Sequence, residues 1–117
     1  MTATIPVRTR ILAGQALSGP VASVGYGVCL LLMSADWTDA PLTLQGSLDV
    51  GEPTAWADLH DHIGNEVVLT VAAGRALTLP PTLLLGWRWL RLRSGLAAAP
   101  VAQAAERLLI LGIRPLA

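Results

Sequence analysis

Both histidines of the chain fall in one short run, Asp58-Leu59-His60-Asp61-His62. In an extended strand, Asp58, His60 and His62 lie on one face, where carboxylate and imidazole groups could converge on a divalent cation. The competing interpretation is a solvated strand end that leads into a turn at Asp61-His62-Ile63-Gly64-Asn65. We favour the turn and expect neither a metal site nor another cofactor.

Other patterns that carry catalysis are missing from the sequence. Ser, His and Asp are present, but there is no Gly-x-Ser-x-Gly nucleophile elbow and no second base placed near a nucleophile. Gly25-Tyr26-Gly27 lacks the later glycine, the lysine and the following helix of a phosphate-binding loop. We therefore assign no catalytic residues and expect a protein that is not an enzyme.

Tryptophan and arginine concentrate between Gly86 and Gly95. Period-2 alternation predicts a strand here, with Arg88, Leu90, Leu92 and Ser94 on one side and Trp89, Arg91 and Arg93 on the other. Large aromatic side chains beside arginine are typical of a binding surface. Salt bridges to a neighbouring protein chain explain these arginines better than nucleic acid does, because the net charge is zero.

The four tryptophans, Trp37, Trp56, Trp87 and Trp89, have two competing interpretations. Exposed Trp can stack on sugar rings, whereas a chain without Phe needs Trp to fill its core. We expect about two or three of the four in the core or at a subunit interface.

The composition favours a protein that buries surface against another chain. Hydrophobic residues make up 53% and charged residues only 14%, which leaves few charges to cover a small monomer. The balanced charge gives no general attraction to nucleic acid or to an anionic membrane. Cys29 is the single cysteine, so an internal disulfide and a multi-thiolate metal site are excluded.

The uncharged segment from Ile11 to Ala35 could be a secretory signal or a membrane span. Glycines and Pro20 interrupt it, and only Val28–Met33 is densely apolar, whereas a spanning helix needs about 20 residues. We expect Val28–Met33 to be a strand buried on both faces, and no membrane insertion.

Short apolar or alternating runs separated by Gly and Pro predict an all-β fold, a β-sandwich or jelly roll with seven to nine short antiparallel strands. Residues 1–10 are expected as an extended N-terminal arm and residues 11–117 as a single β-sandwich domain. Leu42–Ser47 alternates as a half-buried strand does, and residues 66–71 and 76–79 are expected to form a hairpin. Residues 101–107 are ambiguous between helix and loop, and residues 107–113 read as a buried final strand.

Several runs together resemble small virion structural proteins of tailed bacteriophages and prophages. The resemblance covers roughly residues 28–114 and is carried by Asp36-Trp37-Thr38, Gln45-Gly46-Ser47, Trp56-x-Asp58-Leu59, Leu92-Arg93-Ser94-Gly95 and Pro100-Val101-Ala102-Gln103. It implies a β-sandwich located on the virion, of the capsid decoration or cement type, which carries no catalytic residues.

We therefore expect a non-enzymatic protein that binds and stabilises a capsid surface. Its partners would be the major capsid protein or other virion proteins, and further copies of itself in a homo-oligomer, with no nucleic acid and no membrane. The expected protein interface comprises Arg8, Arg10, Trp87, Trp89, Arg91 and Arg93. The alternatives are a carbohydrate-binding module in which Trp37, Trp56 or Trp89 stacks on sugar, and a metal-dependent enzyme at His60 and His62.

Overall fold

The computed structural model describes residues 3–80 and 82–116, and these residues form nine strands and no helix. The strands are β1 (Ile5–Ile11), β2 (Val21–Ala22), β3 (Tyr26–Leu32), β4 (Leu42–Ser47), β5 (Ala57–Asp58), β6 (Ala76–Thr78), β7 (Trp89–Leu96), β8 (Ala99–Pro100) and β9 (Arg107–Pro115). All of the paired strands run antiparallel. The expected all-β class is confirmed.

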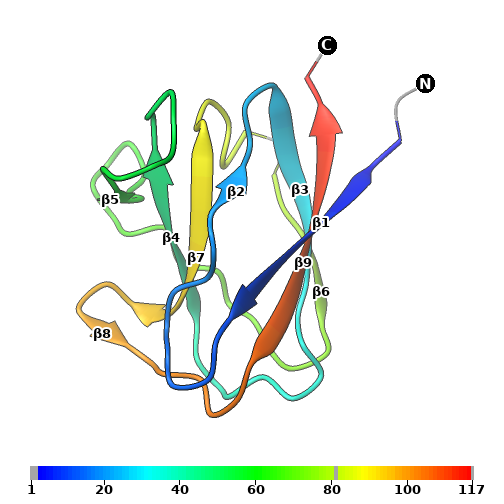
Figure 1. Cartoon of the computed structure of the whole chain (residues 1–117), viewed down its shortest axis with the longest axis vertical. Coiled ribbons are helices and arrows are strands. Elements are labelled where there is room, and N and C mark those ends of the chain that lie inside the picture. The colour runs from blue at the N-terminus through cyan, green and yellow to red at the C-terminus, as the bar shows by residue number, and fades with distance from the viewer. Residues whose placement is uncertain (1–2, 81, 117) are drawn as a thin grey trace.

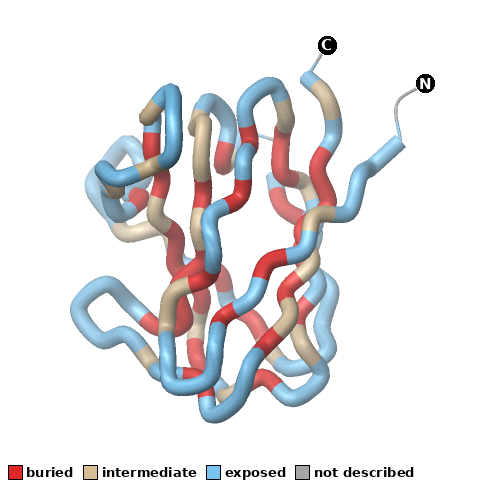
Figure 2. Tube along the Cα trace, viewed as in Figure 1, coloured by how far each residue is buried: buried red, intermediate tan, exposed pale blue. Residues whose placement is uncertain are grey.

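The strands form two sheets that face each other as a β-sandwich (Figure 1). The first sheet has the order β1-β9-β3-β6; the second has the order β2-β7-β4-β5, and β8 pairs with β7. Both sheets turn apolar side chains inward, so Leu31 and Leu111 from the first join Leu44 and Leu92 from the second in one core. Buried positions alternate with exposed ones along the second half of β1 and the end of β3, whereas β4 has no exposed residue (Figure 2). Hydrophobic burial between two amphipathic sheets thus builds the domain.

The N-terminal segment is a strand of the first sheet and not a separate arm. From Ile5 to Ile11 it pairs with β9 in continuous register, Ile5 opposite Ile113 and Ile11 opposite Arg107. Ile11 is fully buried, and Thr9 donates its hydroxyl to the Gly19 carbonyl. Strand β1 therefore runs across the expected boundary at residue 10 and is tied to the sheet by its pairing with β9. The first two residues of the expected arm lie outside the described part of the chain.

Strand β3 is buried on one face only, which corrects the expectation for Val28–Met33. Val28 and Leu31 face the core, whereas Leu30 and Leu32 are 37% and 45% exposed. A register shift between Val28 and Leu30 places a bulge at Cys29, which is half-buried. Among the described residues no helix is long and apolar enough to cross a membrane.

The expected hairpin of residues 66–71 and 76–79 does not form. The first segment makes only isolated bridges, Glu66 to His60 and Leu69 to Leu42, at the edge of the second sheet. Residues 76–78 become β6 and pair with β3 in the first sheet. A turn closed by Gly74, at φ 69°, carries the chain from one sheet to the other, so adjacent segments join different layers.

Residues 101–106, before β9, form no helix, and Gln103 in this segment is the centre of a buried hydrogen-bond network. Gln103 is fully buried; its amide donates to Ser94 Oγ and to the Thr38 carbonyl, and its side-chain oxygen accepts from Thr38 N and Arg107 Nε. Arg107 in turn pairs with Asp36 at 2.8 Å. These bonds join β7, β9 and the β3–β4 connection at one end of the sandwich, and satisfied buried networks of this kind fix a single packing.

Candidate binding surfaces

The alternation expected in the tryptophan- and arginine-rich strand is confirmed in β7. Leu90 and Leu92 are buried in the core, whereas Trp89 and Arg91 are half-buried on the outer face of the second sheet. Strand β4 lies beside β7 in the register Gln45 opposite Arg91, so the polar residues of the two strands share that face.

Arg93 is fully engaged within the chain. Its guanidinium contacts Asp58 at 2.7 Å and Glu66 at 3.2 Å, and Nε donates to Thr43 Oγ1 at 2.9 Å. The hydrogen bond from Arg93, followed by one from Gln45, holds the pKa of Asp58 below its ordinary value of 3.8. The side chain of Arg93 is only 7% exposed. Arg93 therefore ties β7 to β5 and to the 60–66 loop, and little of it is left for a partner.

Arg91 sits beside this ion cluster in a fixed orientation. Its Nε donates to Gln45 Oε1 at 2.7 Å, and its guanidinium carbon lies 4.3 Å from the centroid of the Trp56 ring. Desolvation, and then repulsion by Arg93, lowers the pKa of Arg91. Gln45, Glu66 and the stacking of Trp56 on Arg91 were not foreseen, because the sequence does not show which strands lie side by side.

The tryptophans divide between the core and this outer face. Trp37 is 6% exposed and donates its indole N–H to the Ala40 carbonyl. Trp87 packs against the core and covers Gly46. Trp89 donates to the Asp49 carbonyl, and one ring face of Trp56 is occupied by Arg91. Sugar stacking stays a prediction for Trp56 and Trp89, whereas burial leaves Trp37 no exposed ring face for a sugar.

The histidine run forms a strand end and a turn. Asp58 closes β5, and the Asp61 carboxylate accepts from the backbone N–H groups of Ile63 and Asn65. These bonds hold the pKa of Asp61 below its ordinary value. Within residues 3–80 and 82–116 no group of three or more His, Cys, Asp or Glu side chains is placed to hold a metal ion.

The outer face of the first sheet is a second candidate surface, and it is apolar. Antiparallel register places outward-facing residues in two rows across the strands: Pro6, Gly112, Leu30 and Thr78 in one, and Arg8, Ile110, Leu32 and Ala76 in the other. Gly112 has no side chain, and Leu30 and Thr4 close over it. A shallow groove of about 160 Å³ runs here between Leu30, Leu32 and Ile110. We call this surface, from Pro6 to Leu32 across the sheet, the apolar face.

Arg8 and Arg10 lie on β1 at the edge of the apolar face, away from the tryptophans. Arg8 is exposed opposite Ile110, and Arg10 lies 3.7 Å from Glu106 with both side chains 56% exposed. The six residues expected to form one interface are thus split between two sheets. Comparisons with protein-family models, curated proteins and solved structures find no match to this chain.

Proposed function

We propose that this chain is a non-enzymatic structural protein of a virion that binds and stabilises the capsid surface, as a decoration or cement protein does. The observation that carries the proposal is the apolar face, where Leu30, Leu32 and Ile110 meet solvent side by side on a rigid sheet. Large contiguous apolar patches on soluble proteins commonly mark an interaction site.

The charges at its edge indicate the chemistry of the partner. Arg8 is exposed at the margin, and Arg10 on the same strand pairs with Glu106 at 3.7 Å. A complementary surface therefore has an apolar centre flanked by carboxylates, which a capsid protein can present. An interface of standard size covers about 800 Å² on each partner, more than the groove alone, so the whole sheet face would be in contact.

The test is binding of the purified protein to empty phage capsids, followed by heating of bare and decorated shells. We expect saturable binding that raises the melting temperature of the shell. The double variant Leu30→Gln with Leu32→Gln should bind at least about tenfold more weakly, because tenfold corresponds to only about 1.4 kcal/mol and two apolar contacts are lost.

The matched control replaces exposed apolar residues elsewhere. Val50 and Ile63 are 84% and 70% exposed in loops of the second sheet, so Val50→Gln with Ile63→Gln should bind capsids like the wild type. Equal loss in both double variants, or no binding to heads at all, would count against the proposal. In a second outcome, the apolar face pairs two copies of this chain. Sedimentation of the free protein detects this outcome, because it measures whether the chain is a monomer or a dimer.

A further inference from the structure

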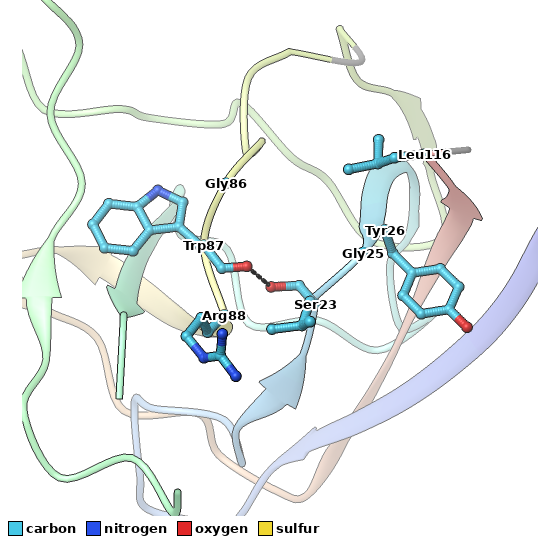
Figure 3. Close-up of a pocket in the computed structure, with 8 residues that line it drawn as sticks. Ser23, Gly25, Tyr26, Gly86, Trp87, Arg88 and Leu116 are labelled. Carbon is cyan, nitrogen blue, oxygen red and sulfur yellow. Dashed lines mark hydrogen bonds between the residues drawn. The ribbon is translucent and has the colours of Figure 1, made fainter. Parts of the chain in front are cut away.

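A small pocket opens at the end of the sandwich where both sheets meet. It has a volume of about 180 Å³ and is lined by the β2–β3 turn, the residues just before β7 and the end of β9: Ser23, Val24, Gly25, Tyr26, Gly86, Trp87, Arg88 and Leu116. Figure 3 shows Ser23 and Arg88 on one side and the Tyr26 ring on the other, with its hydroxyl directed away from them. A water takes about 30 Å³ of liquid, so the pocket can hold a group of side-chain size.

Arg88 is the unusual residue of this pocket. Its Nε is buried and has no hydrogen-bond acceptor among the described residues. The ion pairs found in residues 3–80 and 82–116 engage Arg10, Arg93 and Arg107, and none engages Arg88. Buried guanidinium groups are ordinarily paired, because an unsatisfied charged donor away from water is costly. The Nε–H donor of the half-buried Arg88 is therefore unsatisfied within the described residues.

The backbone around Arg88 is held rigidly. Its N–H donates to the Ser47 carbonyl at 3.2 Å, and its carbonyl accepts from Ser23 N at 2.9 Å. The Ser23 hydroxyl donates to the Trp87 carbonyl at 2.7 Å, as the dashed line in Figure 3 marks. These bonds fix the two walls of the pocket relative to each other, so the backbone that carries the Arg88 side chain is preorganised.

Two glycines in left-handed backbone conformations form part of the pocket wall. Gly25 and Gly86 have φ values of 78° and 93°, and a Cβ added at either would meet nothing within 4 Å. Val24 and Leu116 add apolar lining, whereas Trp87 turns its carbonyl toward Ser23 and packs its ring over Gly46 (Figure 3). The pocket thus combines one cation with a partly apolar wall, which suits an anion on a short hydrocarbon stem.

We propose that this pocket binds a carboxylate, with Arg88 as its charged partner. A planar carboxylate can meet a guanidinium through two parallel charge-assisted hydrogen bonds, which a neutral amide cannot match. The carboxylate comes either from an acidic side chain of a partner protein or from a free organic acid. The site lies apart from the apolar face and does not depend on the proposed capsid role.

The test is a ligand titration of the full chain by NMR. The titration is monitored through the amide resonances of Gly25 and Gly86 and the Nε–H resonance of Arg88. Propionate is the first probe, and its neutral isostere propionamide is the control ligand. We expect saturable shifts with propionate, and at least about tenfold weaker binding of propionamide. Tighter binding of N-acetylglutamate α-amide than of propionate would assign the pocket to a partner's acidic side chain; the reverse order would assign it to a free acid.

Three variants complete the test. Arg88→Met should abolish saturable binding of propionate. Arg88→Lys keeps the positive charge but loses the two parallel N–H donors of the guanidinium, so it should weaken binding several-fold. Arg8→Gln, on the other sheet, should bind propionate like the wild type. Arg88→Met should melt no lower than the wild type, since it removes an unpaired buried donor. Equal binding of propionamide by the wild type, or propionate binding that survives in Arg88→Met, would overturn the proposal.

Discussion

At the scale of single residues, Arg93 is held in a cluster with Asp58 and Glu66. Arg93 was expected to meet a partner protein, but the structure turns it to two carboxylates of its own chain. Its role is therefore to hold β5 and the 60–66 loop against β7. Arg91 and Trp89 lie on the outer face of the same sheet, where hydrogen bonds to Gln45 and Asp49 hold them. Both stay candidates for contact with a partner.

The pH dependence of stability measures how much Asp58 contributes to this cluster. Its pKa is lowered, first by the hydrogen bond from Arg93, so its ionised form stabilises the fold above the ordinary pKa of 3.8. This contribution is lost as the pH falls below 3.8 and through the lower folded-state pKa. Asp58→Asn should cost about 1 kcal/mol at pH 7, because Asp58 is partly exposed, and the gap to wild type should narrow in acid.

Urea unfolding of both proteins at pH 7 and near pH 3 measures that gap. Glu52→Gln, in an exposed loop, is the control and should leave stability unchanged at both pH values. An Asp58→Asn deficit that stays the same in acid would show that Asp58 does not act through its charge.

At the scale of elements, β4 can contact the segment before β7 because Gly46 has no side chain. A Cβ on Gly46 would lie 2.5 Å from atoms of the Trp87 ring. Gly46→Ala therefore forces Trp87 to move and should destabilise the protein by about 1–3 kcal/mol, with a red shift of tryptophan emission. The matched control is Gly51→Ala, where an added Cβ meets nothing within 4 Å. Equal unfolding midpoints for the two variants would contradict this packing.

The elements also show where local pattern suffices and where it fails. Strands β4, β7 and β9 were foreseen because their alternation or apolar run is set locally. The sheet assignment of β1 and β6 was not foreseen, since each pairs with a strand far away in the sequence. The apolar face was missed for a related reason: Leu30 and Leu32 are as apolar as Leu31, so residue type alone does not separate the solvent side from the core side.

At the scale of the whole molecule, the chain closes on itself. Strand β1 pairs with β9, placing Ile5 opposite Ile113, and β2 pairs with β7. Gln103 then joins the β3–β4 connection to β7 and β9 at one end. With the two ends of the sequence in one sheet and both sheets sharing a core, neither sheet can keep its buried face covered without the other.

We therefore expect one cooperative unfolding transition, followed equally by tryptophan fluorescence and by far-UV circular dichroism. Refolding should take milliseconds to seconds, because distant strands must meet before their contacts stabilise the fold. Stopped-flow mixing from urea measures the rate, and Trp37 and Trp87 report from different parts of the core. A fluorescence change that precedes the loss of sheet signal would mean that the two sheets separate before either one unfolds. Refolding in microseconds would mean that local contacts, and not the closure of β1 on β9, limit the rate.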